Sequence, residues 1–157
     1  MKYKIYKKNL NIGEITIKNQ ISENVIKLIY EEIGFYDYKT IKVRIDKNTK
    51  EYQIQYSSLK EKNIYEKSWT ILSSTDLIIL PWELYLFIIV NESKSDSNLI
   101  MDTINWKYCN VRSKKINDNI LYYYSPMQLK VVLHNNCYIK EVIDYFNNIK
   151  IILSEVK

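Results

Sequence analysis

A chain of 157 residues, 46% hydrophobic and 26% charged, is long enough to bury a core and too apolar to be disordered. Its formal charge of +5 excludes no class of partner. Only two of its 23 basic residues are arginine, whose guanidinium group suits phosphate and guanine. This composition disfavours a dedicated nucleic-acid domain. The sequence has no alanine and many Ile, Lys, Asn and Tyr residues, a bias typical of an AT-rich genome, so abundant lysine and tyrosine are not by themselves functional signals.

Alternation of apolar and polar residues predicts two β-hairpins, 2–8 with 13–18 and 40–46 with 51–57. In the second hairpin one face is apolar, formed by Ile41, Val43, Ile45, Tyr52, Ile54 and Tyr56. The opposite face is polar and mildly basic, formed by Lys42, Arg44, Gln53 and Gln55. The sheet is therefore expected to have one buried side and one solvated side.

Helical spacing of apolar residues predicts two amphipathic helices. The first covers 22–33, where Ser22 offers an N-cap and Gly34 stands at the position of a C′ glycine. Its apolar stripe is Val25, Leu28, Ile29 and Ile33. The second covers about 138–148, with the stripe Ile139, Val142, Ile143 and Phe146.

Other segments are assigned by their polarity. Residues 58–67 are expected to form a surface loop or short helix, and 113–119 a turn. Further strands are expected at 68–73, 99–104 and 106–112. Two segments stay open: 120–136 has both a helix start at Ser125–Pro126 and a strand-like stretch, and 149–156 either continues the second helix or forms a last strand.

The most apolar stretch, 77–90, is too short for a membrane span and contains Pro81 and Glu83, which both disfavour one. Two buried strands joined at Pro81 and Trp82 are favoured, and a buried helix from Trp82 to Val90 is the alternative.

These elements predict a single α+β domain over 1–157, a mostly antiparallel sheet with two helices packed on it. The N-terminus has no apolar segment of the kind found in signal peptides, and two cysteines are few for a secreted scaffold. A cytoplasmic protein that does not associate with membranes is therefore expected.

Candidates for metal or nucleophile chemistry are few. His134, Cys137 and Cys109 would supply only three ligands of a structural zinc site, and a Cys137–His134 nucleophile pair oriented by Asn135 or Asn136 has no further support. No metal site, cofactor or catalytic set is predicted from these residues.

A metal-dependent nuclease is the best enzymatic hypothesis. Glu92 and Lys94 follow an apolar run, with Asp76 and Glu83 upstream, an arrangement in which carboxylates bind a metal ion and the lysine orients water. The pattern of an acid two residues before a lysine occurs three times, about as often as chance would give, so the prediction leans against an enzyme.

The first function hypothesis is a non-catalytic protein-binding module, such as a small inhibitor, an immunity or counter-defence protein, or a subunit of a larger assembly, with homo-oligomers also allowed. Tyrosine is enriched at interfaces, and three consecutive tyrosines cannot all face one side of a strand. The predicted partner-binding residues are Tyr122, Tyr123, Tyr124, Trp106 and Tyr108.

The alternative is a nucleic-acid-binding module. Lys2, Lys4, Lys42 and Arg44 would share one sheet face if the two hairpins pair, and tyrosines interleaved with them would stack on bases. A lysine-coated solvent face is the simpler interpretation of the same residues.

Overall fold

The computed structural model describes residues 1–35, 37–49, 51–60, 62–72, 81–88, 99–102, 107–125, 127–135 and 138–156. These residues form two compact units. The first comprises Met1–Lys4, Ile12–Asp76 and Ser154–Lys157, and the second comprises Ile5–Asn11 and Leu77–Leu153.

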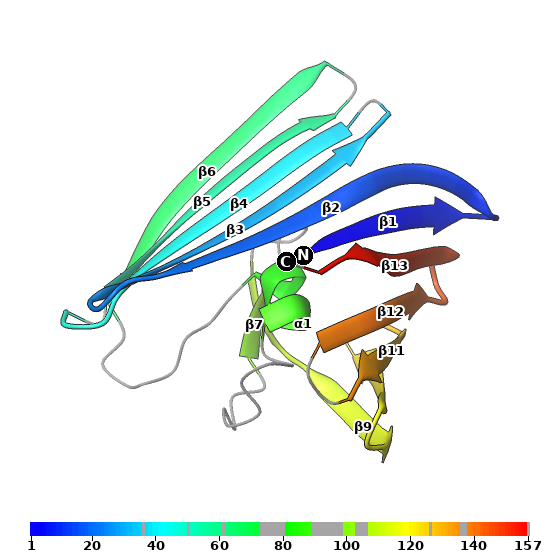
Figure 1. Cartoon of the computed structure of the whole chain (residues 1–157). Coiled ribbons are helices and arrows are strands. Elements are labelled where there is room, and N and C mark those ends of the chain that lie inside the picture. Colours follow the sequence, from blue (N-terminus) through cyan, green and yellow to red (C-terminus); the bar gives the residue numbers. More distant parts are fainter. Residues whose placement is uncertain are drawn as a thin grey trace. The chain divides into compact units, whose positions relative to one another are not determined.

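The first unit is an antiparallel meander of long strands, drawn from blue to green in Figure 1. Its strands are β1 (Lys2–Lys7, the first half), β2 (Leu10–Ile21), β3 (Val25–Gly34), β4 (Asp37–Asp46), β5 (Glu51–Lys60) and β6 (Asn63–Leu72). Each pairs with the next in the chain, so the order follows the sequence and β6 is the edge. The core lies on one face, where Ile17, Leu28, Tyr30, Val43 and Ile54 are buried.

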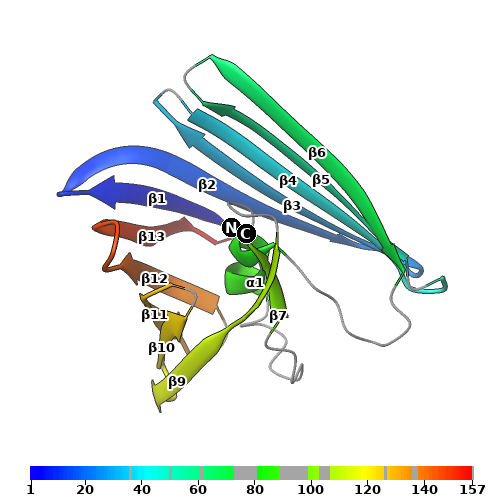
Figure 2. The same ribbon diagram turned by 180° about the vertical axis from the view of Figure 1, so that it is seen from behind.

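The second unit combines shorter strands with a short helix, which Figure 2 shows from behind. A sheet runs in the order β13-β12-β11-β10-β9, and β7 pairs separately with β8. The bounds are α1 (Trp82–Ile88), β7 (Leu99–Asp102), β8 (Lys107–Asn110), β9 (Arg112–Asn117), β10 (Ile120–Ser125), β11 (Leu129–His134), β12 (Tyr138–Asp144) and β13 (Ile149–Glu155). Helix α1 packs with Tyr85 and Leu86 against Ile100, Tyr123 and Leu129, leaving a cavity of only about 10 Å³.

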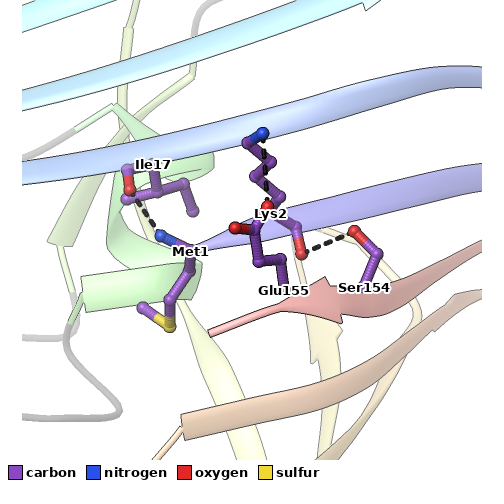
Figure 3. A network of polar contacts seen from close by, with 5 residues as sticks. All are labelled: Met1, Lys2, Ile17, Ser154 and Glu155. Carbon is purple, nitrogen blue, oxygen red and sulfur yellow. Dashed lines mark hydrogen bonds and ion pairs between the residues drawn. The ribbon is translucent and has the colours of Figure 1, made fainter. Parts of the chain in front are cut away.

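The first strand is held from both sides near the N-terminus, as Figure 3 shows. The Met1 amino group donates to the Ile17 carbonyl at 2.9 Å, and the Ile17 amide donates to the Met1 carbonyl at 2.9 Å. On the other side, Ser154 Oγ donates to the Lys2 carbonyl at 3.1 Å, and Lys2 Nζ lies 3.2 Å from Glu155 Oε2. The N-terminal strand therefore lies between β2 and the end of β13.

The predicted α+β class is wrong, because nearly all of the described chain is antiparallel sheet. The expected helix at 22–33 is strand β3, paired along its length with β2 and β4. Leu28 and Tyr30 are buried while Lys27 is exposed, which is the alternation of a strand. Gly34 is not a helix cap but lies within this strand, opposite Gly13.

The expected helix at 138–148 is also wrong. It is strand β12 followed by a turn in which Asp144 Oδ1 accepts hydrogen bonds from the amides of Phe146 and Asn147. The strand carries a bulge, since Val132 pairs with Glu141 but Leu133 pairs with Ile139, which leaves Lys140 as the extra residue. Ile139 and Val142 are therefore both buried although they stand three positions apart in the chain.

Both predicted hairpins are confirmed. The pairs Ile41–Tyr56 and Val43–Ile54 lie in register, and Lys42 and Arg44 are exposed on the opposite face. The expected loop at 58–67 and the expected turn at 113–119 are instead largely strand, in β5 and β6 and in β9. The open segments 120–136 and 149–156 contain strands β10, β11 and β13.

Within the apolar stretch 77–90, residues Trp82–Ile88 form helix α1 and not the second of the two favoured strands. A helix starting at Trp82 was the alternative prediction. Pro81 sits at its start, where its carbonyl accepts hydrogen bonds from the amides of Leu84 and Tyr85. Proline at this place avoids the clash that it would cause inside a helix. Residues 77–80 and 89–90 lie outside the described part of the chain.

Candidate functional site

In the first unit, the strand register determines which side chains lie next to one another on each face of the sheet. Directly opposed residues of neighbouring antiparallel strands share a face, so β2 to β6 present rows of side chains that run across the strands. We call the side opposite the buried core the polar face. It carries Lys18, Lys27, Lys42, Arg44, Gln53, Gln55 and the residues in register with them.

An apolar row crosses this polar face near one end of the strands. Ile33 lies opposite Tyr38, Tyr38 opposite Leu59, and Leu59 opposite Ile64. Their exposed fractions are 54%, 38%, 38% and 73%, and Phe35, in the turn between β3 and β4, is 74% exposed. We call Ile33, Tyr38, Leu59 and Ile64 the apolar row. Large side chains gathered at an exposed place on a sheet are a feature of interaction sites.

Carboxylates lie beside the apolar row. Glu14 is opposite Ile33 on β2. Glu31 and Glu66 lie two residues from Ile33 and from Ile64 on the same strands, and therefore on the same face. Glu31 is 3.7 Å from Lys18. The apolar row therefore has an acidic border on one side.

A second row on the same face is basic. Lys27 lies directly opposite Arg44, Gln20 lies opposite Lys27, and Gln53 lies opposite Arg44. We call these four residues the basic row. An open depression of about 320 Å³ is lined by Gln20, Ile21, Ser22, Val25, Lys27 and Arg44. The lining of this depression combines two cations, an amide, a hydroxyl and two aliphatic side chains.

Two carboxylates lie close to the basic row, and both are already engaged. Glu51 Oε1 accepts a hydrogen bond from Gln53 Nε2 at 3.3 Å. Asp46 Oδ1 accepts hydrogen bonds from the amides of Asn48 at 2.9 Å and Thr49 at 3.1 Å. The hydrogen bonds from Thr49 and Asn48 hold the pKa of Asp46 below its ordinary value, with a smaller contribution from Arg44. This carboxylate therefore stabilises the turn between β4 and β5.

The structure places the predicted nucleic-acid-binding residues only partly together. Lys42 and Arg44 project from the polar face of β4. Lys2 and Lys4 belong to the same face, because Met1 pairs with Ile17, but Lys2 is engaged by Glu155. Three of the tyrosine rings, those of Tyr3, Tyr30 and Tyr56, are buried on the other side of the sheet, whereas Tyr38 lies on the polar face in the apolar row.

The three consecutive tyrosines alternate as a strand requires. Tyr123 is buried, and burial, together with Tyr85, raises its pKa to about 12. Tyr124 is exposed, as is Tyr108 on β8, while Trp106 lies outside the described residues. Tyr122 lies opposite Lys114 and Lys130 on the neighbouring strands. The Tyr122 and Tyr124 rings thus belong to the outer side of this sheet.

The residues weighed for catalysis are not brought together in the described part of the structure. Glu92, Lys94, Asp76 and Cys137 lie outside it, and Glu83 is buried in α1. His134 is exposed, stacks on Tyr138 with ring centres 5.0 Å apart, and contacts Asn135. Burial and Asp102 raise the pKa of the free Cys109 thiol despite Lys107. No cluster of three His, Cys, Asp or Glu side chains suited to one metal ion occurs among the described residues.

The apolar row was not anticipated from the sequence. Its members stand at strand ends beside turns, where single apolar residues look unremarkable until the register aligns them. A sequence signal did exist, because Ile33, Leu59 and Ile64 fall on the polar side of the alternation in their strands.

No helix in the described residues is both long enough and apolar enough to span a bilayer. Comparison with protein-family models, with curated proteins and with solved structures finds no match to this chain.

Proposed function

We propose that this protein is a non-catalytic module that binds another protein through the apolar row of its first unit. The observation that carries the proposal is the register that aligns Ile33, Tyr38, Leu59 and Ile64 across four adjacent strands. Each of these side chains is exposed to solvent, although the opposite face of the same sheet has a buried core. Burying an exposed side chain of this size contributes about 1.5–3 kcal/mol, so a few of them suffice to anchor a complex.

The shape of this surface suits a folded partner. The apolar row is carried by hydrogen-bonded strands, so its side chains are displayed on a rigid backbone and little ordering entropy is lost on binding. Tyr38 within the row adds a ring that has an apolar body and a polar tip, the type of residue that is enriched at interfaces.

The charges around the row indicate the kind of partner. Glu14, Glu31 and Glu66 border the row on the polar face, so a complementary surface has an apolar centre and basic residues at its edge. We therefore propose that the partner is another protein with such a surface, and not a second copy of this chain. Binding of a second copy would give a cross-linked dimer in the experiment below.

Site-specific photo-cross-linking tests the proposal. A photoreactive residue is placed at Ile64 in the row, and in a matched control at Ser68 on the same strand and face. In the native cells we expect one cross-linked protein from position 64 and little from position 68. The cross-linked protein is then purified and titrated against the wild-type chain to establish direct binding. Equal cross-linking from both positions, or a product that consists of two copies of this chain, would contradict the proposal.

A further inference from the structure

The basic row places two like charges directly opposite each other. Lys27 and Arg44 occupy directly opposed positions on β3 and β4, where like charges repel. The residues that continue the row on either side, Gln20 and Gln53, are neutral. Within the described part of the chain neither cation forms an ion pair, whereas Lys18 on the same face is matched by Glu31.

Two acids lie close to the basic row without forming an ion pair with Lys27 or Arg44. Glu51 Oε1 accepts a hydrogen bond from Gln53, and Asp46 interacts with Arg44 by a smaller electrostatic contribution. Asp46 lies two residues beyond Arg44 and opposite Val25, and its Oδ1 atom accepts the amides of Asn48 and Thr49 in the turn. It is therefore held at the end of the strand, where its charge offsets part of that of Arg44, and Lys27 has no such partner among the described residues. Lys42, on the same strand and face as Arg44, adds a further positive charge to this part of the sheet.

The depression beside the two cations offers more than charge. Its volume is about 320 Å³, near the lower end for small-molecule sites. The Gln20 amide adds a neutral donor, and Ile21 and Val25 add an aliphatic wall. A planar guanidinium bonds two oxygens of one phosphate, and an ammonium group adds a point charge beside it.

We propose that the depression lined by Gln20, Lys27 and Arg44 binds a phosphate group. Arg44 and Lys27 contact its oxygens from adjacent strands, Gln20 donates to a further oxygen, and the carrier of the phosphate lies against Ile21 and Val25. This site is separate from the apolar row and does not depend on it. The phosphate group has two natural sources, a small phosphomonoester or the phosphodiester backbone of a nucleic acid, and both would be held by the same contacts.

A titration at constant ionic strength tests this site. Amide and side-chain NMR signals of the wild-type chain are followed while sodium phosphate replaces sodium chloride. We expect saturable shifts at residues 20–27 and 44, and binding at least tenfold weaker in Lys27→Gln and in Arg44→Gln. Lys114→Gln on β9, an exposed lysine of the second unit, serves as the matched control and should bind as wild type does. Unchanged affinity in both basic-row variants, or equal loss in the control, overturns the proposal.

Stability measurements in chloride alone show that the variants fold and test the repulsion independently. Because one like charge is removed, Lys27→Gln should unfold at the same or a higher temperature than wild type in chloride, and at a lower temperature in phosphate. A lower unfolding temperature in chloride would show that Lys27 supports the fold, and would count against the site.

Two further ligands identify the source of the phosphate. Phenyl phosphate represents a monoester, and an oligothymidylate without terminal phosphates represents the backbone. Saturable binding of phenyl phosphate alone assigns a small molecule, and binding of the oligonucleotide with a steep loss at higher salt assigns a nucleic acid. If neither ligand binds through Lys27 and Arg44, the proposal fails.

Discussion

Gly13 and Gly34, the two glycines of the chain, lie directly opposite each other on β2 and β3. A Cβ atom on Gly13 would come within 2.7 Å of the Ile33 carbonyl oxygen, while one on Gly34 would come no closer than 3.5 Å to a neighbouring atom. Neither glycine has a positive φ angle. The requirement at position 13 is therefore for space between two closely approaching strands.

The glycine pair gives a matched test of this packing. Gly13→Ala should lower the free energy of unfolding by about 1–3 kcal/mol, because the backbone must shift to relieve the clash. Gly34→Ala should leave it unchanged or raise it by about 0.4–1 kcal/mol, since alanine restricts the unfolded chain. Urea denaturation of both variants checks this, and equal destabilisation would contradict the register at this pair.

Substitutions in β3 distinguish the strand from the helix predicted by its sequence. Leu28→Ala should cost about 2–5 kcal/mol of unfolding free energy, because Leu28 is buried. Ile33→Ser should change the unfolding free energy by less than about 0.5 kcal/mol, because Ile33 is exposed on the polar face. A helix with the stripe of Leu28 and Ile33 would require both to be costly, and chemical denaturation separates the two cases.

Tyr123 makes the stability of the second unit dependent on alkaline pH. Its pKa is raised from 10.0 to about 12 in the folded chain, so the folded state holds this proton more tightly than the unfolded state. This contribution to the free energy of unfolding, about 2–3 kcal/mol, is fully present below pH 10 and is lost as the pH rises towards 12. In Tyr123→Phe this loss should be absent. Unfolding free energies of both proteins between pH 9 and 12 measure it, and parallel pH curves would contradict the burial of this phenol.

Cys109 should react slowly with alkylating reagents. Burial and the charge of Asp102 raise its pKa, which lowers the thiolate fraction near neutral pH. In a Cys137→Ser background, the rate of reaction with iodoacetamide at pH 8 should be at least several-fold below that of a free cysteine peptide. A rate equal to or above that of the peptide would show an activated thiol and would reopen a nucleophilic role.

The hairpins could be predicted from the sequence because each has one buried face, so that Ile41, Val43 and Ile54 alternate with polar residues. Edge strands lack this signal. β9 is exposed along its whole length, and the polar segment at its position predicted a turn. Hydrophobic alternation reports burial on one face, and a strand with no buried face does not show it.

The two false helices have different causes. The apolar residues of β3 are dense enough to fit both the repeat of a strand and the repeat of a helix. Leu28 and Tyr30 alternate as in a strand, while Leu28 and Ile29 also extend a helical stripe. In β12 the bulge at Lys140 shifts the inward positions, so Ile139 and Val142 acquire helical spacing. The candidate site was missed because the apolar row and the basic row exist only once the register aligns residues from separate strands.

The binding account is tested most directly by the affinity of the cross-linked partner for variants of the apolar row. Isothermal titration calorimetry of the purified partner compares the wild-type chain with Leu59→Lys and Ile64→Lys, and with Ser68→Lys as the control on the same face. Because a lysine at positions 59 or 64 would place a charge in the apolar contact, we predict at least tenfold weaker binding for both row variants and wild-type affinity for the control. Wild-type affinity in Leu59→Lys and Ile64→Lys, with the fold intact, would contradict the claim that this row is the recognition surface.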